Sequence, residues 1–180
     1  KNIKTSNLND LRELIGYVTQ ESFLFSDTIY NNIAFGTHNC REKEVTDAAK
    51  AAGIYENIKQ FKEQFQTVIG ERGITLSGGQ KQRLSIARAL IRNPKVMLFD
   101  DCLSAVDTKT EELILQNIKA HSKSKSCIII SHRASSLKHA DQIIVLDKGE
   151  IIEQGTHKEL IHFDGEYARI YEKQLVEIHE

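Results

Sequence analysis

Two adjacent glycines open a helical segment near the middle of this chain. The stretch LSGGQ spans residues 76–80, and the Leu84, Ala87 and Ile91 that follow recur at the spacing of one helix face. The first N–H groups of a helix have no partner inside it and favour anions, phosphates above all. An ordinary Ser-capped helix would explain Ser77, but not two glycines that are each less favourable in a helix by about 1 kcal/mol. The segment therefore predicts a site that holds a phosphate.

A complete phosphate loop is not found in the sequence. Its usual pattern is G-x-x-x-x-G-K-[ST], and none of the ten glycines is followed by Lys and then by Ser or Thr. The only methionine is Met97, so there is no initiator residue. We therefore expect a piece of a longer chain.

Two acids close the apolar run VMLFDD, at Asp100 and Asp101. Continuous apolar runs of strand length are typical of parallel strands that are covered on both faces. Ligands of open α/β sheets bind at the carboxyl ends of the strands. There, one Asp can hold Mg²⁺ through water, and a second acid can orient or deprotonate an attacking water. The alternative is that both are helix-capping or surface acids.

Two further polar residues follow predicted strands. The run CIIIS brings His132 to the edge where the acids lie, and Gln20 ends the strand in LRELIGYVTQ. Gln20 could supply a neutral amide oxygen to a metal ion. Either residue could instead be a plain polar strand terminator.

The elements that must position these residues alternate between helices and strands. Val45, Ala48, Ala49 and Ala52 form one apolar helix face, and Asn93-Pro94 ends the later helix.

Further along, Thr108 and Glu111 have the spacing of a capping box. QIIVLDKGEIIEQG predicts two strands that are joined by a tight turn at Lys148-Gly149. An amphipathic helix is expected to close the chain, with Tyr167, Ile170, Tyr171 and Gln174 on one side. The alternation implies an α/β layer architecture.

Composition excludes several classes of protein. Lys and Arg total 24 against 25 Asp and Glu, so no basic excess indicates a nucleic-acid partner. The apolar runs are far shorter than the roughly 18 residues of a membrane helix, and the N-terminus does not resemble a signal peptide. Three cysteines without a C-x-x-C pair fit a reduced, cytosolic setting, and the seven scattered His do not predict a zinc site.

Five motifs occur in the order YVTQ, LSGGQ, VMLFDD, SAVD and ISHR. In this order the chain resembles, over essentially its whole length, the nucleotide-binding domain of ATP-binding-cassette (ABC) transporters, entered part-way through. LSGGQ is similar to the family signature, and Gln20 to its Q-loop. Asp100 is similar to the Walker B aspartate, Asp107 to the end of the D-loop, and His132 to the switch histidine.

The resemblance implies an ATPase with ATP and Mg²⁺ as cofactors. It implies catalytic roles for Asp101 and His132, and Mg²⁺ ligation by Gln20 and Asp100. The ATP-binding residues that it implies are Gln20, Ser77, Gly78, Gly79, Gln80, Asp100 and Asp107. The fold that it implies is a RecA-like parallel-sheet lobe with an α-helical subdomain. Residues 1–22 would end the core lobe with the Q-loop, residues 23–92 would form the helical subdomain with the signature, and residues 93–180 would form the rest of the core lobe.

In this family two such domains pair head to tail, and each signature caps the nucleotide that the other domain holds. Ser77, Gly78 and Gly79 would then grip the γ-phosphate of a partner's ATP. The phosphate loop for this domain's own ATP should lie upstream of Lys1, so the fragment alone is expected to be soluble and inactive.

The segments FLFSDTIYNNIAFG and VIGERG resemble exporter-type domains. In these, the nucleotide-binding domain follows the membrane helices, and both segments would lie near cytoplasmic loops of the transmembrane domain. The intact protein is therefore expected at the cytoplasmic face of the inner membrane.

Asp101 departs from the family pattern, because members that hydrolyse ATP efficiently usually carry Glu at this position. An Asp carboxylate falls back by roughly 1 Å, and a misplacement of about 1 Å can cost on the order of a hundredfold in rate. We expect a site that binds ATP and turns it over slowly, as in one half of a heterodimeric exporter; a homodimer is the alternative.

Two rival functions remain. One is an ABC-type ATPase of DNA repair or translation that is not attached to a membrane domain. The other is an interaction module whose signature and D-loop are vestigial.

Overall fold

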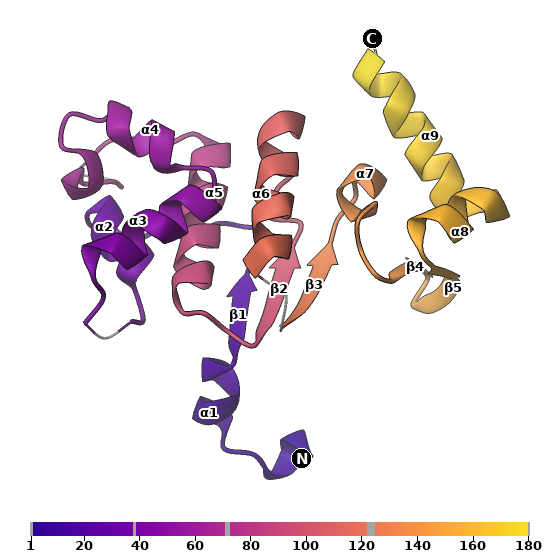
Figure 1. Ribbon diagram of the computed structural model, residues 1–180, viewed down its shortest axis with the longest axis horizontal. Helices are drawn as coiled ribbons and strands as arrows, with labels where there is room; N and C mark the ends of the chain where they lie inside the picture. The colour runs from indigo at the N-terminus through magenta and orange to yellow at the C-terminus, as the bar shows by residue number, and fades with distance from the viewer. Residues whose placement is uncertain (1, 38, 71–72, 122–124, 180) are drawn as a thin grey trace. The chain divides into compact units, whose positions relative to one another are not determined.

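The computed structural model describes residues 2–37, 39–70, 73–121 and 125–179 (Figure 1). Contacts divide the chain into two units, Lys1–Ile130 and Ser131–Glu180, and each unit is described by itself. The predicted boundaries at residues 22/23 and 92/93 do not coincide with this division and stay a prediction. Among the described residues no helix has both the length and the apolar character needed to cross a membrane.

The first unit contains a parallel sheet of three strands in the order β1-β2-β3. The strands are β1 (Ile15–Val18), β2 (Val96–Asp100) and β3 (Ser126–Ile130). Val18 pairs with Phe99, and Asp100 pairs with Ile130. β2 and β3 lie where the sequence predicts them. β1 is shorter than the strand predicted for residues 11–20, because residues 11–13 are helical and the strand ends at Val18, two residues before Gln20. The carboxyl ends of the three strands meet at one edge of the sheet, which brings the residues that follow them together.

The sheet is covered on one face only, so the expectation of burial on both faces is wrong for the described residues. Val18, Met97 and Phe99 are at most 2% exposed. On the opposite face Tyr17 is 53% exposed and Ile128 is 51% exposed. The apolar runs VMLF and CIIIS therefore carry more apolar surface than the described elements bury.

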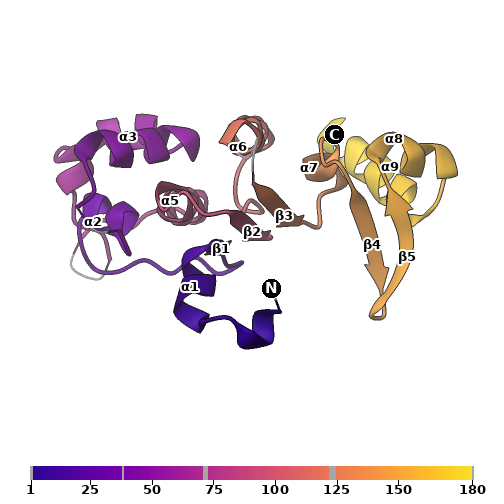
Figure 2. The ribbon, with the colours of Figure 1, turned by 60° about the horizontal axis from the view of Figure 1, so that its bottom comes forward.

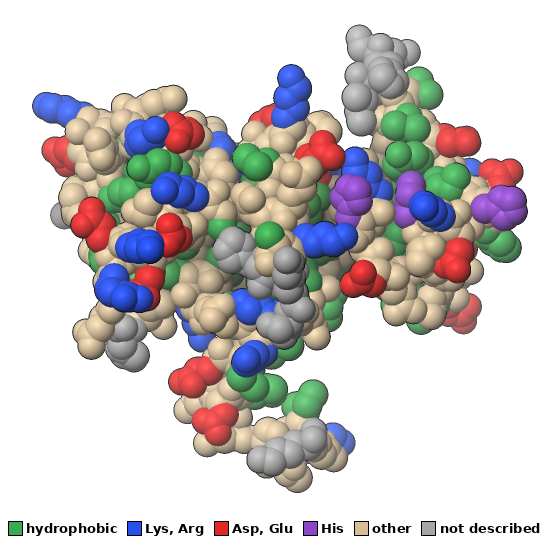
Figure 3. All heavy atoms as spheres, viewed as in Figure 1, with side chains coloured by type: hydrophobic (Ala, Val, Ile, Leu, Met, Phe, Trp, Pro, Cys, Tyr) green, Lys and Arg blue, Asp and Glu red, His purple; other side chains and the backbone are tan. Residues whose placement is uncertain are grey.

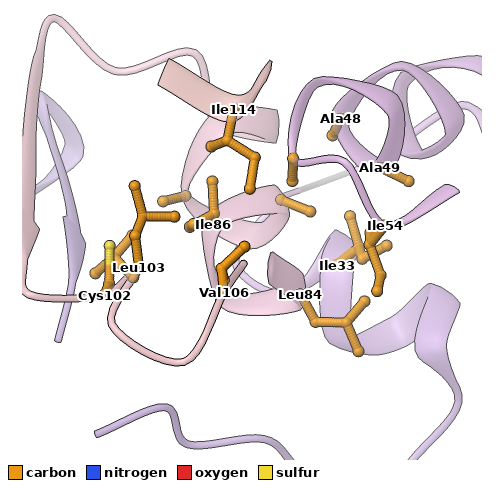
Figure 4. Close-up of a cluster of buried hydrophobic side chains, with 14 of the residues drawn as sticks. Ile33, Ala48, Ala49, Ile54, Leu84, Ile86, Cys102, Leu103, Val106 and Ile114 are labelled. Atoms are coloured by element: carbon orange, nitrogen blue, oxygen red, sulfur yellow. The ribbon is translucent and has the colours of Figure 1, made fainter. Parts of the chain in front are cut away.

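Helices pack on the covered side. In chain order they are α2 (Ile29–Ala34), α3 (Glu42–Ala51), α4 (Tyr55–Gln60), α5 (Gly78–Ile91) and α6 (Thr108–His121), with a short 3₁₀ turn at Gln64–Gln66. Helix α1 (Leu8–Glu13) and the 3₁₀ turn at Ile3–Thr5 precede the amino end of β1, and no residue of α1 is buried (Figure 1). Helix α5 packs against α2, α3 and β1 (Figures 1 and 2). Its Leu84, Ile86 and Ala87 are at most 1% exposed and join the core shown in Figure 4. The predicted apolar face of α3 is confirmed, because Val45, Ala48 and Ala49 are buried.

The start of α6 differs from the predicted capping box. Thr108 is the first helical residue rather than the cap. The carboxylate Oδ1 of Asp107 accepts a hydrogen bond from the Thr110 N–H at 3.0 Å and caps the helix instead.

The second unit contains a hairpin of β4 (Ile143–Asp147) and β5 (Glu150–Gly155) and the helices α7 (Ala134–Leu137), α8 (His157–Phe163) and α9 (Glu166–His179). Lys148 and Gly149 have φ angles of 48° and 84°, the two positive values of a type I′ turn. Tyr167 of α9 is buried, and its hydroxyl donates to the Ala134 carbonyl at 3.2 Å. The predicted hairpin and closing helix are confirmed.

A buried polar contact joins α2 to α5. Asn32 is 1% exposed, and its Oδ1 accepts from the Phe25 N–H at 2.9 Å and from Arg88 Nη2 at 2.7 Å. Its Nδ2 donates to the Phe25 carbonyl at 3.0 Å. Burial lowers the pKa of the Arg88 guanidinium, so the cation needs these acceptors. Asn32 therefore fixes both α5 and the segment around Phe25.

Replacing Asn32 by Leu should lower the free energy of unfolding by about 2–4 kcal/mol, because it leaves several buried polar groups without partners. Urea unfolding followed by circular dichroism measures this. The matched control is Asn31→Leu on the exposed side of α2, where we expect a loss under about 1 kcal/mol. Equal losses in the two variants would contradict the assigned role of Asn32.

Candidate functional site

The start of α5 is a capping box. The Ser77 Oγ accepts from the Gln80 N–H at 3.3 Å, and the Gln80 Oε1 accepts from the Ser77 N–H at 2.9 Å. The alternative of a Ser-capped helix is therefore present in the structure, and it accounts for the side chains of Ser77 and Gln80. Gly78 and Gly79 occupy the first two helical positions, where the helix itself offers the N–H groups no acceptor.

The two glycines differ in what surrounds them. A Cβ on Gly79 would lie 2.7 Å from the carbonyl oxygen of Ala105, which is closer than atoms can approach. A Cβ on Gly78 would meet only the Cβ of Ala105 at 3.5 Å, an ordinary contact. Packing therefore requires glycine at position 79 and not at position 78. Both glycines are predicted from the sequence to belong to a phosphate site, and Gly79 has a packing role as well.

The loop at residues 101–107 holds Asp101 in an uncommon backbone conformation. Its φ is 42°, in the left-handed region that Asp and Asn tolerate better than most residues. The Asp101 N–H donates to the Ile130 carbonyl at 2.9 Å, and the Asp101 carbonyl accepts from Ser104 Oγ at 3.1 Å. Cys102 and Val106 are buried and anchor the loop in the core. Two hydrogen bonds of its backbone and the buried residues of its loop therefore fix the position of Asp101.

The structure brings three predicted site residues together at the carboxyl edge of the sheet. Gln20 Nε2 lies 3.5 Å from Asp101 Oδ2, and Asp100 precedes Asp101 at the end of β2. A carboxylate only accepts hydrogen bonds, so the amide NH₂ of Gln20 faces Asp101.

Tyr17 also belongs to this group and was missed by the sequence analysis. Its hydroxyl donates to Asp100 Oδ2 at 3.1 Å, and this bond raises the pKa of the phenol because it favours the neutral form. Tyr17 pairs with Leu98, two residues before Asp100 and on the same face of the sheet. A long side chain reaches such a diagonal neighbour, so strand register was the signal that could have found it.

The donor set suits Mg²⁺. Asp100 offers carboxylate oxygens and Gln20 an amide oxygen, and Mg²⁺ usually takes one or two such ligands together with phosphate oxygens and water. Among the described residues there is no group of three or more His, Cys, Asp and Glu side chains that could enclose a metal ion. The residues present therefore fit an ion that arrives with a phosphate rather than a protein-enclosed metal.

Asp107 and His132 have local roles in the structure. Asp107 caps α6, and the Thr110 N–H lowers the pKa of its carboxyl. His132 belongs to the second unit, where its carbonyl accepts from Gln174 Nε2 at 2.7 Å while Gln174 Oε1 accepts from the Ala134 N–H at 2.8 Å. The functional roles of both residues stay predictions.

A shallow groove of about 240 Å³ lies between β1 and α5. Its lining includes Phe23, Phe35, Arg88 and Arg92. Phe23 is 67% exposed and Phe35 52% exposed, while the Arg88 guanidinium lies 5.3 Å from the Phe25 ring centre. Elsewhere, basic and acidic side chains are interspersed on the face drawn in Figure 3. The groove therefore combines apolar surface with a cationic edge.

The sequence matches a known family. The family described as ABC transporter matches residues 1–104. An "ATP-dependent lipid A-core flippase" of Syntrophus aciditrophicus is 43% identical over 175 residues, 97% of this chain and 29% of that protein. A "probable multidrug resistance ABC transporter ATP-binding/permease protein" of Bacillus subtilis is 47% identical over 167 residues, 93% of this chain and 28% of that protein.

A solved structure of an ABC exporter is also similar to this chain. A bacterial Atm1-family ABC exporter with ATP bound has a TM-score of 0.91 and 43% identity, over 97% of this chain and 31% of that one. The chain thus spans less than a third of the length of these relatives. The mixed α/β fold with a parallel sheet is confirmed as that of an ABC ATPase domain fragment.

Gly79→Ala should lower the free energy of unfolding by about 1–3 kcal/mol, because the new methyl group would displace either α5 or the Ala105 loop. Gly78→Ala is the matched control, and it should be neutral or stabilising by up to about 1 kcal/mol. Urea unfolding measures both, and equal effects at the two positions would contradict the close contact.

Proposed function

The chain belongs to the ABC transporter family, and we propose that it is the larger part of an exporter's nucleotide-binding domain, which binds and hydrolyses ATP to drive export across a membrane. The observation that carries the proposal is the meeting of Gln20, Asp100 and Asp101 at the carboxyl edge of the sheet. Exporter relatives that match nearly the whole chain support it.

Each residue of this edge has a proposed task. Asp100 and Gln20 hold Mg²⁺, which when bound neutralises charge on the phosphate oxygens. Asp101 orients or deprotonates the attacking water. His132, which belongs to the second unit, keeps the catalytic role that the resemblance implies. Asp107 contributes to ATP binding in addition to capping α6.

The start of α5 is proposed to act on a second nucleotide. Ser77, Gly78 and Gly79 grip the γ-phosphate of ATP that a partner domain holds, in a head-to-tail pair, and Gln80 contributes to the binding of that ATP. Support comes from the N–H groups of Gly78 and Gly79, for which the helix itself offers no acceptor, and from the positive end of the helix dipole.

The bare face of the sheet supports an upstream phosphate loop. Tyr17, Ile128 and Ile130 are each about half exposed there, although parallel sheets are normally covered on both faces. We propose that the segment that carries the phosphate loop in the longer protein covers this face. An exposed apolar sheet face would otherwise favour association between copies.

The groove between β1 and α5 is proposed to receive a cytoplasmic loop of the transmembrane domain. Its exposed Phe23 and Phe35 offer apolar contact, and Arg88 and Arg92 offer charge. The VIGERG segment was expected near the same loops, but Glu71 and Arg72 lie outside the described residues. This docking would place the domain at the cytoplasmic face of the membrane.

The rival ATPase of DNA repair or translation is not favoured by these relatives. The sequence upstream of Lys1 decides between the two functions. Several membrane-length apolar segments there would support an exporter, whereas their complete absence would favour the rival.

The Asp at position 101 supports the proposal that this domain's own site hydrolyses ATP slowly. An Asp carboxylate stands back from the water by roughly 1 Å, and the partner of a heterodimer would then carry out most of the hydrolysis with its own Glu and this chain's signature.

Asp101→Glu should raise ATP hydrolysis at this site by about 10- to 100-fold in the full-length protein with its partner, because it restores the reach of the base. Steady-state phosphate release measures the rate. Glu is less tolerant than Asp of the left-handed backbone at this position, so the variant also needs a control for strain.

Asp164→Glu supplies this control. Asp164 also has a left-handed backbone, with φ of 56°, at the end of α8 and has no proposed part in the chemistry. It should change stability slightly and leave hydrolysis as it is. A rate that Asp101→Glu leaves unchanged would overturn the proposal of slow hydrolysis at this site.

A further inference from the structure

We propose that Gln82 is a positioning residue that connects the start of α5 to the backbone of Asp101. Gln82 is 6% exposed, one of few buried polar side chains in the described chain. Its position follows Gly79 by three residues, so both lie on the same face of α5, toward the loop at residues 101–107.

Both ends of the Gln82 amide are used. Its Oε1 accepts from the Ala105 N–H at 3.0 Å, and its Nε2 donates to Ser104 Oγ at 3.3 Å. A backbone N–H can only donate, so the oxygen of the amide must face Ala105 and the NH₂ must face Ser104. The contact therefore has one orientation.

Ser104 passes the contact on to Asp101. Its hydroxyl has a single hydrogen, and this hydrogen is donated to the Asp101 carbonyl at 3.1 Å. Because the Gln82 NH₂ group donates to one lone pair of Ser104 Oγ, the hydroxyl hydrogen points away from Gln82 and toward the Asp101 carbonyl. Asp101 needs such a hold, since its φ of 42° lies in a sparsely populated region.

The helix start and the loop thus move as one piece. The Gly79 backbone is in close contact with the Ala105 carbonyl, and Gln82 adds two hydrogen bonds on the same side. A shift of α5 against the loop would break both contacts together. The position of α5 is in this way coupled to the backbone of Asp101.

A functional consequence rests on the proposed function above. The start of α5 would face the partner's nucleotide, whereas Asp101 would face the nucleotide of its own domain. Through its contacts in this one chain, Gln82 would then couple the nucleotide site of this domain to the nucleotide site of the partner domain. Its loss should lower kcat and leave KM nearly unchanged, because it displaces a catalytic group rather than a binding one.

The structural test uses this 180-residue chain and NMR spectroscopy. Gln82→Glu keeps an acceptor for the Ala105 N–H and loses the donor to Ser104, whose hydroxyl then turns to the new carboxylate. We expect the ¹³C signal of the Asp101 carbonyl to shift while the Ala105 amide keeps its protection from hydrogen exchange. Ser104→Ala should shift the same Asp101 signal.

Two comparisons sharpen the test. Gln82→Leu removes both bonds and should speed exchange of the Ala105 amide by about tenfold. Gln116→Glu, an exposed change of the same kind on α6, should leave the Asp101 and Ala105 signals as they are. If Gln82→Glu and Ser104→Ala both leave the Asp101 signal in place, the proposal is overturned.

The functional test uses ATP hydrolysis by the full-length protein. Gln82→Glu and Ser104→Ala should each lower kcat by about threefold to tenfold, and the double variant should be no slower than the slower single one, because both act through one contact. If the losses in kcat of the two single variants multiply in the double variant, Gln82 and Ser104 do not act through one contact, and the proposal is contradicted. If the full-length protein hydrolyses no ATP at all, the proposed function fails, and the NMR result alone decides the role of Gln82.

Discussion

The packing of α5 is the constraint on which the described site depends. One face of this helix fills the core of the first unit, and its N-terminal end lies so close to Ala105 that Gly79 cannot carry a side chain. The same helix is held by the buried Asn32–Arg88 contact at α2. A single element therefore fixes the helix start that is proposed to meet a phosphate, the loop that carries Asp101, and the wall of the groove beside β1.

The second determinant is the register of the parallel sheet. Because β2 lies between β1 and β3, the residues that follow β1 and β2 meet at one edge, and Asp101 is further tied to β3 through the Ile130 carbonyl. The half-exposed apolar residues on the bare face show the opposite situation. There the described chain leaves apolar surface uncovered, which agrees with a length below a third of that of its relatives.

The elements could be predicted from the sequence because they rest on local patterns. The spacing of Val45, Ala48 and Ala49 predicted α3, and the apolar runs predicted β2 and β3. What failed depends on tertiary contacts. The reason for Gly79 is a carbonyl 26 positions along the chain, Tyr17 reaches Asp100 only through strand register, and burial of the sheet's second face requires a covering element. The cap of α6 is a local exception, because Asp107, directly before Thr108, accepts from the Thr110 N–H in its place.

The central claim is that this chain supplies a signature in trans, while its own nucleotide is anchored by a phosphate loop upstream. The most direct test is a calorimetric titration of MgATP into the 180-residue chain, beside the same titration into a chain that extends upstream through the expected phosphate loop. The account predicts that only the longer chain binds. Equally tight binding by the 180-residue chain would contradict it, because the nucleotide would then be anchored by residues that are already present.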